Sequence, residues 1–294
     1  MSVQAQAVVG ESNSLSAQFA YTFAPSGKIV SSSSGDDSPF DDAVPSVPVF
    51  VHTFHLGAQY TTPIRGLAIE AGLPLVGVEL GEDSFMHYPV RGEYDDGDLH
   101  WTPTDLRVGL RYQIMAIEQH MGLAFHLATS IPVADYPTQG FAAPGQHLMA
   151  LHLGASIART LEPAVPNLYF QVGYEFSKRE RVDVDDATEE FSRDYSDAEL
   201  EIGYFLPAGF TLAAIANLRL HHGGVEYARL IHYSRSVIEH HDELADEDVL
   251  MAGGDLGYDV TEDFSAVLHT RFFLWGNNTR NQNLFGLSAQ YRFF

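Results

Sequence analysis

The feature that most constrains this chain is an alternation of apolar and polar residues with a period of two, which recurs in about twelve segments. In the segment 105–115 one face carries Leu106, Val108, Leu110, Tyr112 and Ile114. In the segment 167–178 one face carries Leu168, Phe170, Val172, Tyr174 and Phe176. A period of two is that of a β-strand, so we predict an all-β protein.

The other ten predicted strands are 13–25, 47–61, 64–80, 118–133, 145–160, 191–206, 208–222, 247–260, 262–276 and 283–294. A strand of about ten residues that rises ~3.3 Å per residue at a tilt of ~45° spans roughly 23 Å. That span is close to the ~25 Å apolar band of outer-membrane barrels. The lengths therefore favour an antiparallel, up-and-down transmembrane β-barrel.

The connections between these segments alternate strictly between tight and long. The tight ones are 61–63, 116–119, 161–165, 207–209 and 261–263, and the long ones are 25–46, 81–100, 134–145, 179–190, 221–246 and 276–282. With an even number of strands, both chain ends fall on the side of the tight turns. Bacterial outer-membrane barrels have this arrangement, with short periplasmic turns and longer outer loops.

The apolar faces are predicted to contact lipid rather than a second sheet. Lysine, which solvated strand faces use freely, occurs only at Lys28 and Lys178, in or beside long connections. Aromatic residues on the apolar faces gather near the tight turns, as in an interfacial girdle: Tyr60, Tyr112, Tyr204, Phe210, Tyr258, Phe264, Tyr291 and Phe293. A second set near the other rim comprises Phe50, Phe176, Phe272 and Phe285, with Trp275 expected on the opposite, inner face.

Composition excludes several classes of protein. The 16 Lys and Arg against 39 Asp and Glu give a net charge of −23, which argues against nucleic acid as a partner. The chain has no cysteine, so neither a disulfide scaffold nor a thiolate metal site is expected. Residues 5–7 have the small-x-small form of a signal-peptidase site. We therefore expect residues 1–7 to be the tail of an export signal and residues 8–294 to be a single barrel.

Two resemblances to known proteins support this interpretation. The final segment 285–294, FGLSAQYRFF, resembles the aromatic-terminated last strand of outer-membrane proteins, which implies the barrel-assembly machinery as a partner. The segments 104–112, TDLRVGLRY, and 131–136, IPVADY, resemble a hairpin and loop of the outer-membrane transporters grouped with phenol-degradation proteins of the MetA-pathway type. That resemblance implies passive uptake of small, often apolar or aromatic, compounds and no catalytic residue.

Charged residues of both signs lie on the predicted inner faces. As lumen-lining, selectivity-determining candidates we select Arg107, Arg111, Glu175, Glu199, Glu201, Arg219, Asp255, His269 and Arg271. They either line a polar pore or pair with one another and fill a narrow interior. Like charges two or four residues apart, such as Glu199 with Glu201, form a ladder on one inner face. An excess of carboxylates would favour cations or neutral solutes.

The long connection 221–247 is rich in histidine, with His221, His222, His232, His240 and His241 beside Asp242 and Glu243. These side chains could ligate Zn²⁺ or Ni²⁺, but their spacing matches no closed structural site. A solvated outer loop is the preferred interpretation, with a short helix expected over 226–239. Acidic runs, among them Asp95, Asp96 and Asp98, are also interpreted as solvated surface. We predict no metal and no cofactor.

The predicted function is an outer-membrane channel for passive passage of small neutral, weakly cationic or aromatic solutes, with membrane lipid and lipopolysaccharide as surroundings. One alternative is a structural or assembly barrel with a plugged lumen. Another is a lipid hydrolase, which would need a Ser and a His together on the lipid-facing surface near the outer rim. His52 is the histidine that the pattern places on that face. We predict that the protein is not an enzyme.

Overall fold

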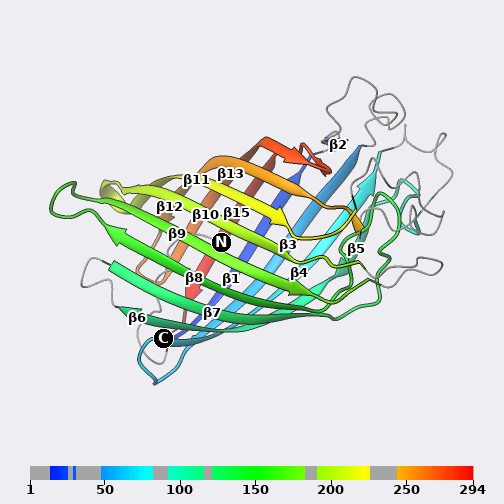
Figure 1. Ribbon diagram of the computed structural model, residues 1–294. Helices are drawn as coiled ribbons and strands as arrows, with labels where there is room; N and C mark the ends of the chain where they lie inside the picture. Colours follow the sequence, from blue (N-terminus) through cyan, green and yellow to red (C-terminus); the bar gives the residue numbers. More distant parts are fainter. Residues whose placement is uncertain are drawn as a thin grey trace.

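The strands form one closed β-barrel (Figure 1). The computed structural model describes residues 14–25, 29–30, 48–81, 92–115, 121–182, 191–225 and 244–293. The wall consists of β1 (Ser14–Ala24), β3 (Val49–Thr61), β4 (Leu67–Leu80), β5 (His100–Pro103), β6 (Asp105–Met115), β7 (Met121–Pro132), β8 (Ala150–Thr160), β9 (Leu168–Arg179), β10 (Tyr195–Phe205), β11 (Phe210–His221), β12 (Asp248–Asp259), β13 (Phe264–Asn277) and β15 (Leu284–Arg292). The short strands β2 (Ile29–Val30) and β14 (Thr279–Arg280) pair with each other.

Every neighbouring pair in the wall is antiparallel, and the barrel closes where β15 pairs with β1. The closing register runs from Ser16 opposite Arg292 to Phe23 opposite Phe285. Thirteen strands belong to the sheet, but β5 and β6 share β4 as their partner and occupy one position, so 13 − 1 = 12 strands surround the lumen. The predicted fold and strand number are confirmed.

One strand was not predicted. β5 begins at His100, the last residue of the predicted connection 81–100, and ends just before the predicted strand 105–115. Pro74 of β4 has no N–H to give to the ladder, and its carbonyl oxygen accepts the N–H of Thr104 at 3.0 Å. The register shifts by one residue here, from Leu75 opposite Pro103 to Gly72 opposite Arg107. The irregularity divides one long strand into β5 and β6.

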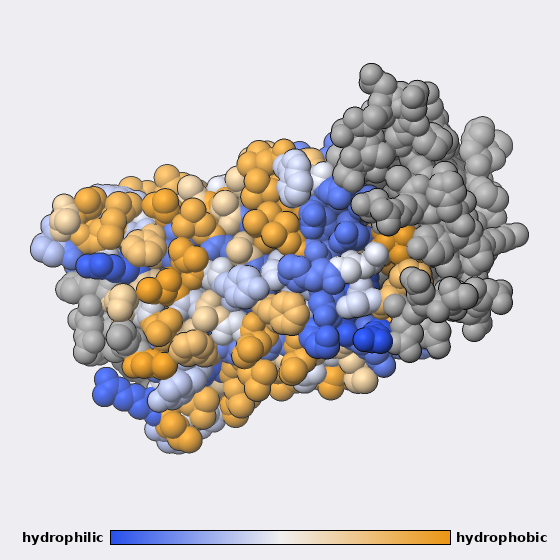
Figure 2. All heavy atoms as spheres, in the orientation of Figure 1, coloured by the Kyte–Doolittle hydropathy of each residue, from blue (hydrophilic) through white to orange (hydrophobic). Residues whose placement is uncertain are grey.

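The two faces of each strand differ as the alternation predicts. In β8, Leu151 and Leu153 are 54% and 60% exposed, whereas His152 between them is 3% exposed. Apolar residues cover most of the visible strand surface, and hydrophilic residues gather toward the end from which the long connections leave (Figure 2). An exposed apolar belt around a closed barrel is suited to lipid. No helix among the residues described is long and apolar enough to cross a membrane.

The aromatic girdles are confirmed, with one correction. Trp275 was expected to face inward because its position has the opposite parity to that of Phe272. A bulge at Leu274 shifts the register between β12 and β13, so that Trp275 lies opposite the outward-facing Leu250. Trp275 is consequently 49% exposed on the outer face and belongs to the girdle near the outer rim.

The two ends of the barrel differ in the length of the connections between strands. Among the described residues, four tight connections lie at one end: 62–66, 161–167, 260–263 and 206–209, the last of which contains the 3-10 turn η3 (Pro207–Gly209). The described chain ends also meet there, where the N–H of Phe293 donates to Leu15. The long connections leave the opposite end, which we call the outer mouth. The export-signal prediction for residues 1–7 and the terminal Phe294 lie outside the described residues.

Lipid contact of the apolar belt can be tested at Leu127, which is exposed in the middle of β7. We expect Leu127→Arg to destabilise the barrel in a bilayer by about 2–4 kcal/mol, because the guanidinium would enter hydrocarbon. Ile64→Arg, in a tight turn, should cost only about 0–1 kcal/mol. Urea unfolding in lipid vesicles measures both, and equal effects at the two sites would contradict a membrane-spanning belt.

Candidate functional site

The inner wall encloses a cavity of about 550 Å³, lined by residues of every barrel position except β3. Among the nine candidate residues, those that line it are Arg107, Arg111, Glu175, Glu199, Arg219, His269 and Arg271. Glu201 and Asp255 line a smaller cavity of about 30 Å³ between β9 and β13. The structure thus places all nine candidates on the inner side of the wall.

Glu175 on β9 is the centre of one polar cluster. Arg107 donates to both of its oxygens, at 3.1 and 2.5 Å, and His126 Nε2 lies 2.5 Å from Oε2. His152 Nδ1 lies 3.2 Å from Oε1. Gly154, opposite both His126 and Glu175 in the register, makes this cluster possible, because a side chain there would overlap the imidazole of His126. One carboxylate therefore holds groups from β6, β7 and β8.

Two further ion pairs join neighbouring strands. Arg111 of β6 lies 3.0 Å from Glu70 of β4. Arg219 of β11 donates to both oxygens of Asp197 on β10, at 2.8 and 3.2 Å, and its guanidinium lies over the ring of Tyr195. Both pairs run along the wall rather than across the lumen, so they leave the central cavity open.

A chain of polar contacts connects the inward-facing side chains of β10 to β15. Asn217 donates to Glu199 at 2.8 Å and accepts from Arg271 Nε at 3.2 Å. Arg271 Nη1 donates to Asp255 Oδ1 at 2.6 Å, and Asp255 Oδ2 lies 2.9 Å from His269 Nδ1. His269 Nε2 and Ser288 Oγ are 2.7 Å apart. This chain links β10 to β15.

Glu199 and Glu201 form the predicted ladder, but they do not share an arginine. Glu201 is only 2% exposed and accepts a hydrogen bond from the Tyr169 hydroxyl at 2.7 Å. Gly203 leaves room for the Tyr169 ring. Within the described part of the chain, Glu201 Oε2 and Glu199 Oε1 are buried without a hydrogen-bond partner. Both oxygens are therefore buried acceptors without a donor, Glu199 beside the central cavity and Glu201 beside the smaller one.

Sequence analysis did not select several partners in these clusters. They are His126, His152, Tyr169, Asn217 and Ser288. Their inward parity could be predicted from the alternation, since each lies an even number of residues from an inward-facing neighbour. Their pairing depends on register between strands, which the alternation does not contain.

The outer mouth is narrowed by segments that fold against the inner wall. Val49, Val76, Val78 and Leu80, at the outer ends of β3 and β4, are buried beneath Ala142, with Phe141 and Tyr94 packed alongside. Arg280 donates to the Phe141 carbonyl at 3.0 Å, which joins the last connection to this cap. We call residues 92–99 and 133–149 the mouth cap.

Asp95 holds the mouth cap together. Its carboxylate accepts the N–H groups of Gly92 at 2.8 Å and of Phe141 and Ala142 at 3.1 and 2.8 Å. Asp95 is 4% exposed, so its interpretation as solvated surface is wrong. The three N–H groups explain the burial, because a carboxylate with several donors needs little water.

A second anchor of the mouth cap lies at Tyr136. Its hydroxyl donates to Asp105 at 2.6 Å and accepts the N–H of His147 at 3.0 Å. Burial, together with the hydrogen bond to Asp105, raises the pKa of Tyr136 well above its usual value. The phenol therefore remains a neutral donor that ties the segment 133–149 to the start of β6.

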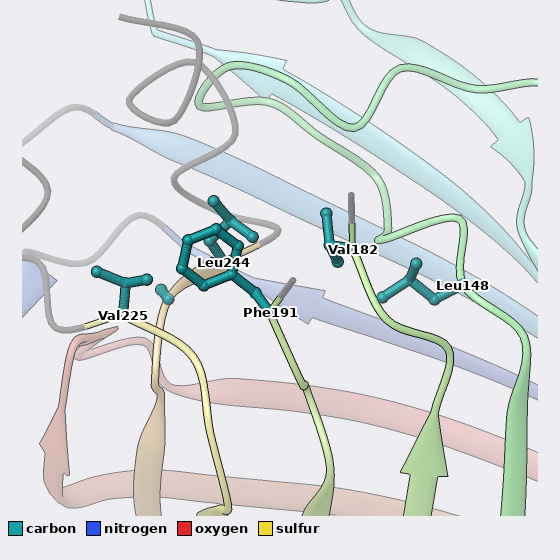
Figure 3. Close-up of a cluster of buried hydrophobic side chains, with 6 residues drawn as sticks. Leu148, Val182, Phe191, Val225 and Leu244 are labelled. Carbon is teal, nitrogen blue, oxygen red and sulfur yellow. The ribbon is translucent and has the colours of Figure 1, made fainter. Parts of the chain in front are cut away.

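The opposite side of the mouth has its own apolar cluster. A buried cluster beyond the ends of β8 to β12 comprises Leu148, Val182, Phe191, Val225 and Leu244 (Figure 3). Leu244 and Ala245 are completely buried in it. The described residues of the outer connections therefore form packed structure over the lumen.

Only part of the histidine-rich connection belongs to the described residues. His221 Nδ1 contacts the Glu247 carbonyl oxygen, and His222 Nε2 lies 2.7 Å from Ser196 Oγ on the outer face. His52 faces outward as predicted and lies 2.8 Å from the Tyr21 hydroxyl. His232, His240, His241 and the expected helix over 226–239 lie outside the described residues. Within the part that is described, no group of three metal-binding side chains occurs.

Comparisons with known proteins bear on the fold. No family model matches the sequence, and no curated protein matches it. The crystal structure of an outer membrane channel from Pseudomonas putida F1 matches over 100% of both chains, with 12% identity and a TM-score of 0.74. The NanC porin matches 94% of this chain and 98% of its own, with 11% identity and a TM-score of 0.51.

The beta domain of the Bordetella autotransporter BrkA matches 95% of this chain and 99% of its own, with 11% identity and a TM-score of 0.50. At these identities the likenesses show the fold alone. Together with the closed barrel and its apolar belt, they define this chain as an outer-membrane β-barrel. Its predicted location in the outer membrane is confirmed, and the phenol-degradation resemblance stays a prediction.

Loss of Glu175 should reduce the free energy of unfolding more than loss of Asp197. Glu175→Ala would leave Arg107 and two histidines without their acceptor, and we expect a loss of about 3–5 kcal/mol in the free energy of unfolding. Asp197→Ala removes the same charge from a pair that is open to the lumen, which should cost less than about 1 kcal/mol. Urea unfolding in detergent compares them, and equal losses would show that Glu175 is no special centre.

Proposed function

We propose that this barrel is a passive channel for small neutral or weakly cationic solutes, aromatic ones included. The observation that carries the proposal is the cavity of about 550 Å³, which stays open beside charges that pair between adjacent strands or, for Arg107 and Glu175, from β6 to β9. A lumen filled by side chains from opposite walls would leave no such space. The P. putida protein that shares the fold is described as a channel, which supports the same role here.

The charges of the wall support a preference for cations over anions. Arg107, Arg111, Arg219 and Arg271 each contact a carboxylate. Glu199 and Glu201 each keep one oxygen without a hydrogen-bond partner in the described structure. The wall around the lumen therefore combines neutralised cations with incompletely neutralised carboxylates, which favours a negative potential in the lumen.

Aromatic side chains in the mouth cap are the reason to include aromatic solutes in this proposal. Tyr94 stacks on His100 with ring centroids 4.3 Å apart, beside the apolar cluster of Val78, Ala142 and Phe141. A planar apolar molecule can stack on the exposed part of this ring pair, whereas Val78 and Ala142 are buried beside it. A plugged structural barrel is the second candidate, and the packing of the mouth cap is the observation that favours it. Contacts with lipopolysaccharide and with the assembly machinery remain proposals.

The cation preference can be tested by changing Glu199 and Glu201 together to glutamine. A unit charge at roughly 8 Å in water contributes about 0.5 kcal/mol, so losing both should lower the cation-to-anion permeability ratio about fivefold or more. Reversal potentials in planar bilayers under a salt gradient give this ratio. Glu262→Gln, in an exposed tight turn, is the matched control and should leave the ratio unchanged.

If neither the wild-type barrel nor the double variant conducts, and the variant melts at a lower temperature in detergent, the charges are a structural filling. The channel proposal would then be wrong. Conduction with an unaltered permeability ratio would retain the channel but remove Glu199 and Glu201 from its selectivity.

The mouth cap should restrict conduction. Asp95→Ala removes the acceptor of three N–H groups, and hydrogen bonds to a charged group contribute about 1.5–3 kcal/mol each. We expect the cap to loosen and single-channel conductance to rise at an unchanged melting temperature of the barrel. Asp98→Ala, an exposed change in the same segment, should have no effect. An unchanged conductance in Asp95→Ala would show that the cap does not limit passage.

A further inference from the structure

The polar chain on β12, β13 and β15 contains a serine, a histidine and an aspartate in the order that nucleophilic catalysis requires. Ser288 Oγ lies 2.7 Å from His269 Nε2, and His269 Nδ1 lies 2.9 Å from Asp255 Oδ2. The register explains the arrangement, because Asp255 lies directly opposite His269 and Ser288 lies two residues beyond the partner of His269. Three adjacent strands thus present the three groups in one row.

The chemistry of the neighbours determines where the protons lie. Asp255 Oδ2 lies 2.9 Å from His269 Nδ1 without hydrogen-bond geometry, so a small rotation of the imidazole is needed for a protonated Nδ1 to donate to it. In the neutral imidazole Nε2 then carries the lone pair, so the Ser288 hydroxyl donates to it. Arg271 Nη1 binds the other oxygen of Asp255 at 2.6 Å and keeps the carboxylate ionised and in place.

Two members of this row border the lumen, although Ser288 is only 3% exposed. Ser288 and His269 both line the cavity of about 550 Å³, together with Gln18, Ala20 and Thr22 of β1. Ala20 lies opposite Ser288, so Gln18 and Thr22 flank it diagonally and carry N–H and O–H donors. Such donors could stabilise a negatively charged oxygen next to Ser288.

We propose that Ser288, His269 and Asp255 form a luminal hydrolase site for small neutral esters, a function beyond passive passage. Ser288 Oγ attacks the carbonyl carbon while its proton passes to His269 Nε2, and the π pair moves onto the carbonyl oxygen. As the carbonyl re-forms, the bond to the alcohol oxygen breaks and Nε2 protonates that oxygen. An acyl-serine remains.

Water completes the reaction at the same atoms. It attacks the acyl carbon and gives a proton to Nε2, after which the carbon–Oγ bond breaks and Nε2 returns the proton to Oγ. Ester and water thereby become acid and alcohol, and no other reactant is needed. Asp255 touches no reacting atom and acts as a positioning residue through His269.

The chain contains matched comparison sites. Ser130, His152 and Glu175 repeat the order on β7, β8 and β9, with Oγ to Nε2 at 2.8 Å and Nδ1 to Oε1 at 3.2 Å. Ser130 does not line the central cavity, and His152 Nδ1 also binds Ser177 at 2.7 Å. Ser196 and His222 form a third pair on the outer face. The proposal therefore predicts reaction at Ser288 and no reaction at Ser130 or Ser196.

The test uses the full-length barrel, folded in detergent, with diisopropyl fluorophosphate as the probe and 4-nitrophenyl acetate as the substrate. We expect one adduct, mapped to Ser288 by mass spectrometry of peptides. Ser288→Ala should abolish both the adduct and ester hydrolysis, while Ser130→Ala and Ser196→Ala should retain them. His269→Gln should slow labelling at least about 100-fold, as expected for loss of a general base.

A conservative replacement separates catalysis from folding. Asp255→Glu should keep a measurable labelling rate and Asp255→Asn should lose it, with heat-modifiable gel migration confirming that both are folded. Ser288→Cys should react with iodoacetamide faster when His269 is present than in the His269→Gln background. An unlabelled wild-type barrel, or labelling that persists in Ser288→Ala, would overturn the proposal. Because these readouts need no conduction, they stand apart from the channel experiments.

Discussion

The pairing of β15 with β1 is the interaction on which the rest of this structure depends. In hydrocarbon there is no water to bind unpaired backbone N–H and C=O groups, so a sheet can enter a membrane only if it has no free edge. The register from Ser16 opposite Arg292 to Phe23 opposite Phe285 removes that edge. Closure also makes the two faces of every strand unlike, with lipid outside and an enclosed lumen inside.

Enclosure explains how the inner charges are arranged. A carboxylate on the wall cannot reach bulk water freely, and the nearest opposite charges are those that the register places on adjacent or nearby strands. Glu175 binds groups from β6, β7 and β8, and Asp255 contacts Arg271 and His269 on β13. Pairing along the wall satisfies these groups and leaves the central cavity available. The same arrangement places Ser288 beside His269, whose Nδ1 lies 2.9 Å from Asp255 Oδ2.

The mouth adds a different kind of constraint. Asp95 and Tyr136 hold the mouth cap to the wall through hydrogen bonds to buried partners, and apolar clusters lie on both sides of it. The cap and the cavity are compatible, because the clusters occupy the outer ends of the strands while the cavity lies among the inner charges. A channel of this form would select first by shape and stacking at the mouth and then by charge in the lumen.

The alternation in the sequence by itself determined the all-β fold, the twelve strand positions, the end with the tight turns and the inward direction of Arg107, Glu175 and the other seven candidates. It did so because side-chain direction in a strand depends only on parity. Only the tertiary structure decided which inward groups meet, since register is a property of two strands and not of one. It also decided the outward turn of Trp275, which a single bulged residue reverses, and the burial of Asp95, whose three donors come from two separate segments.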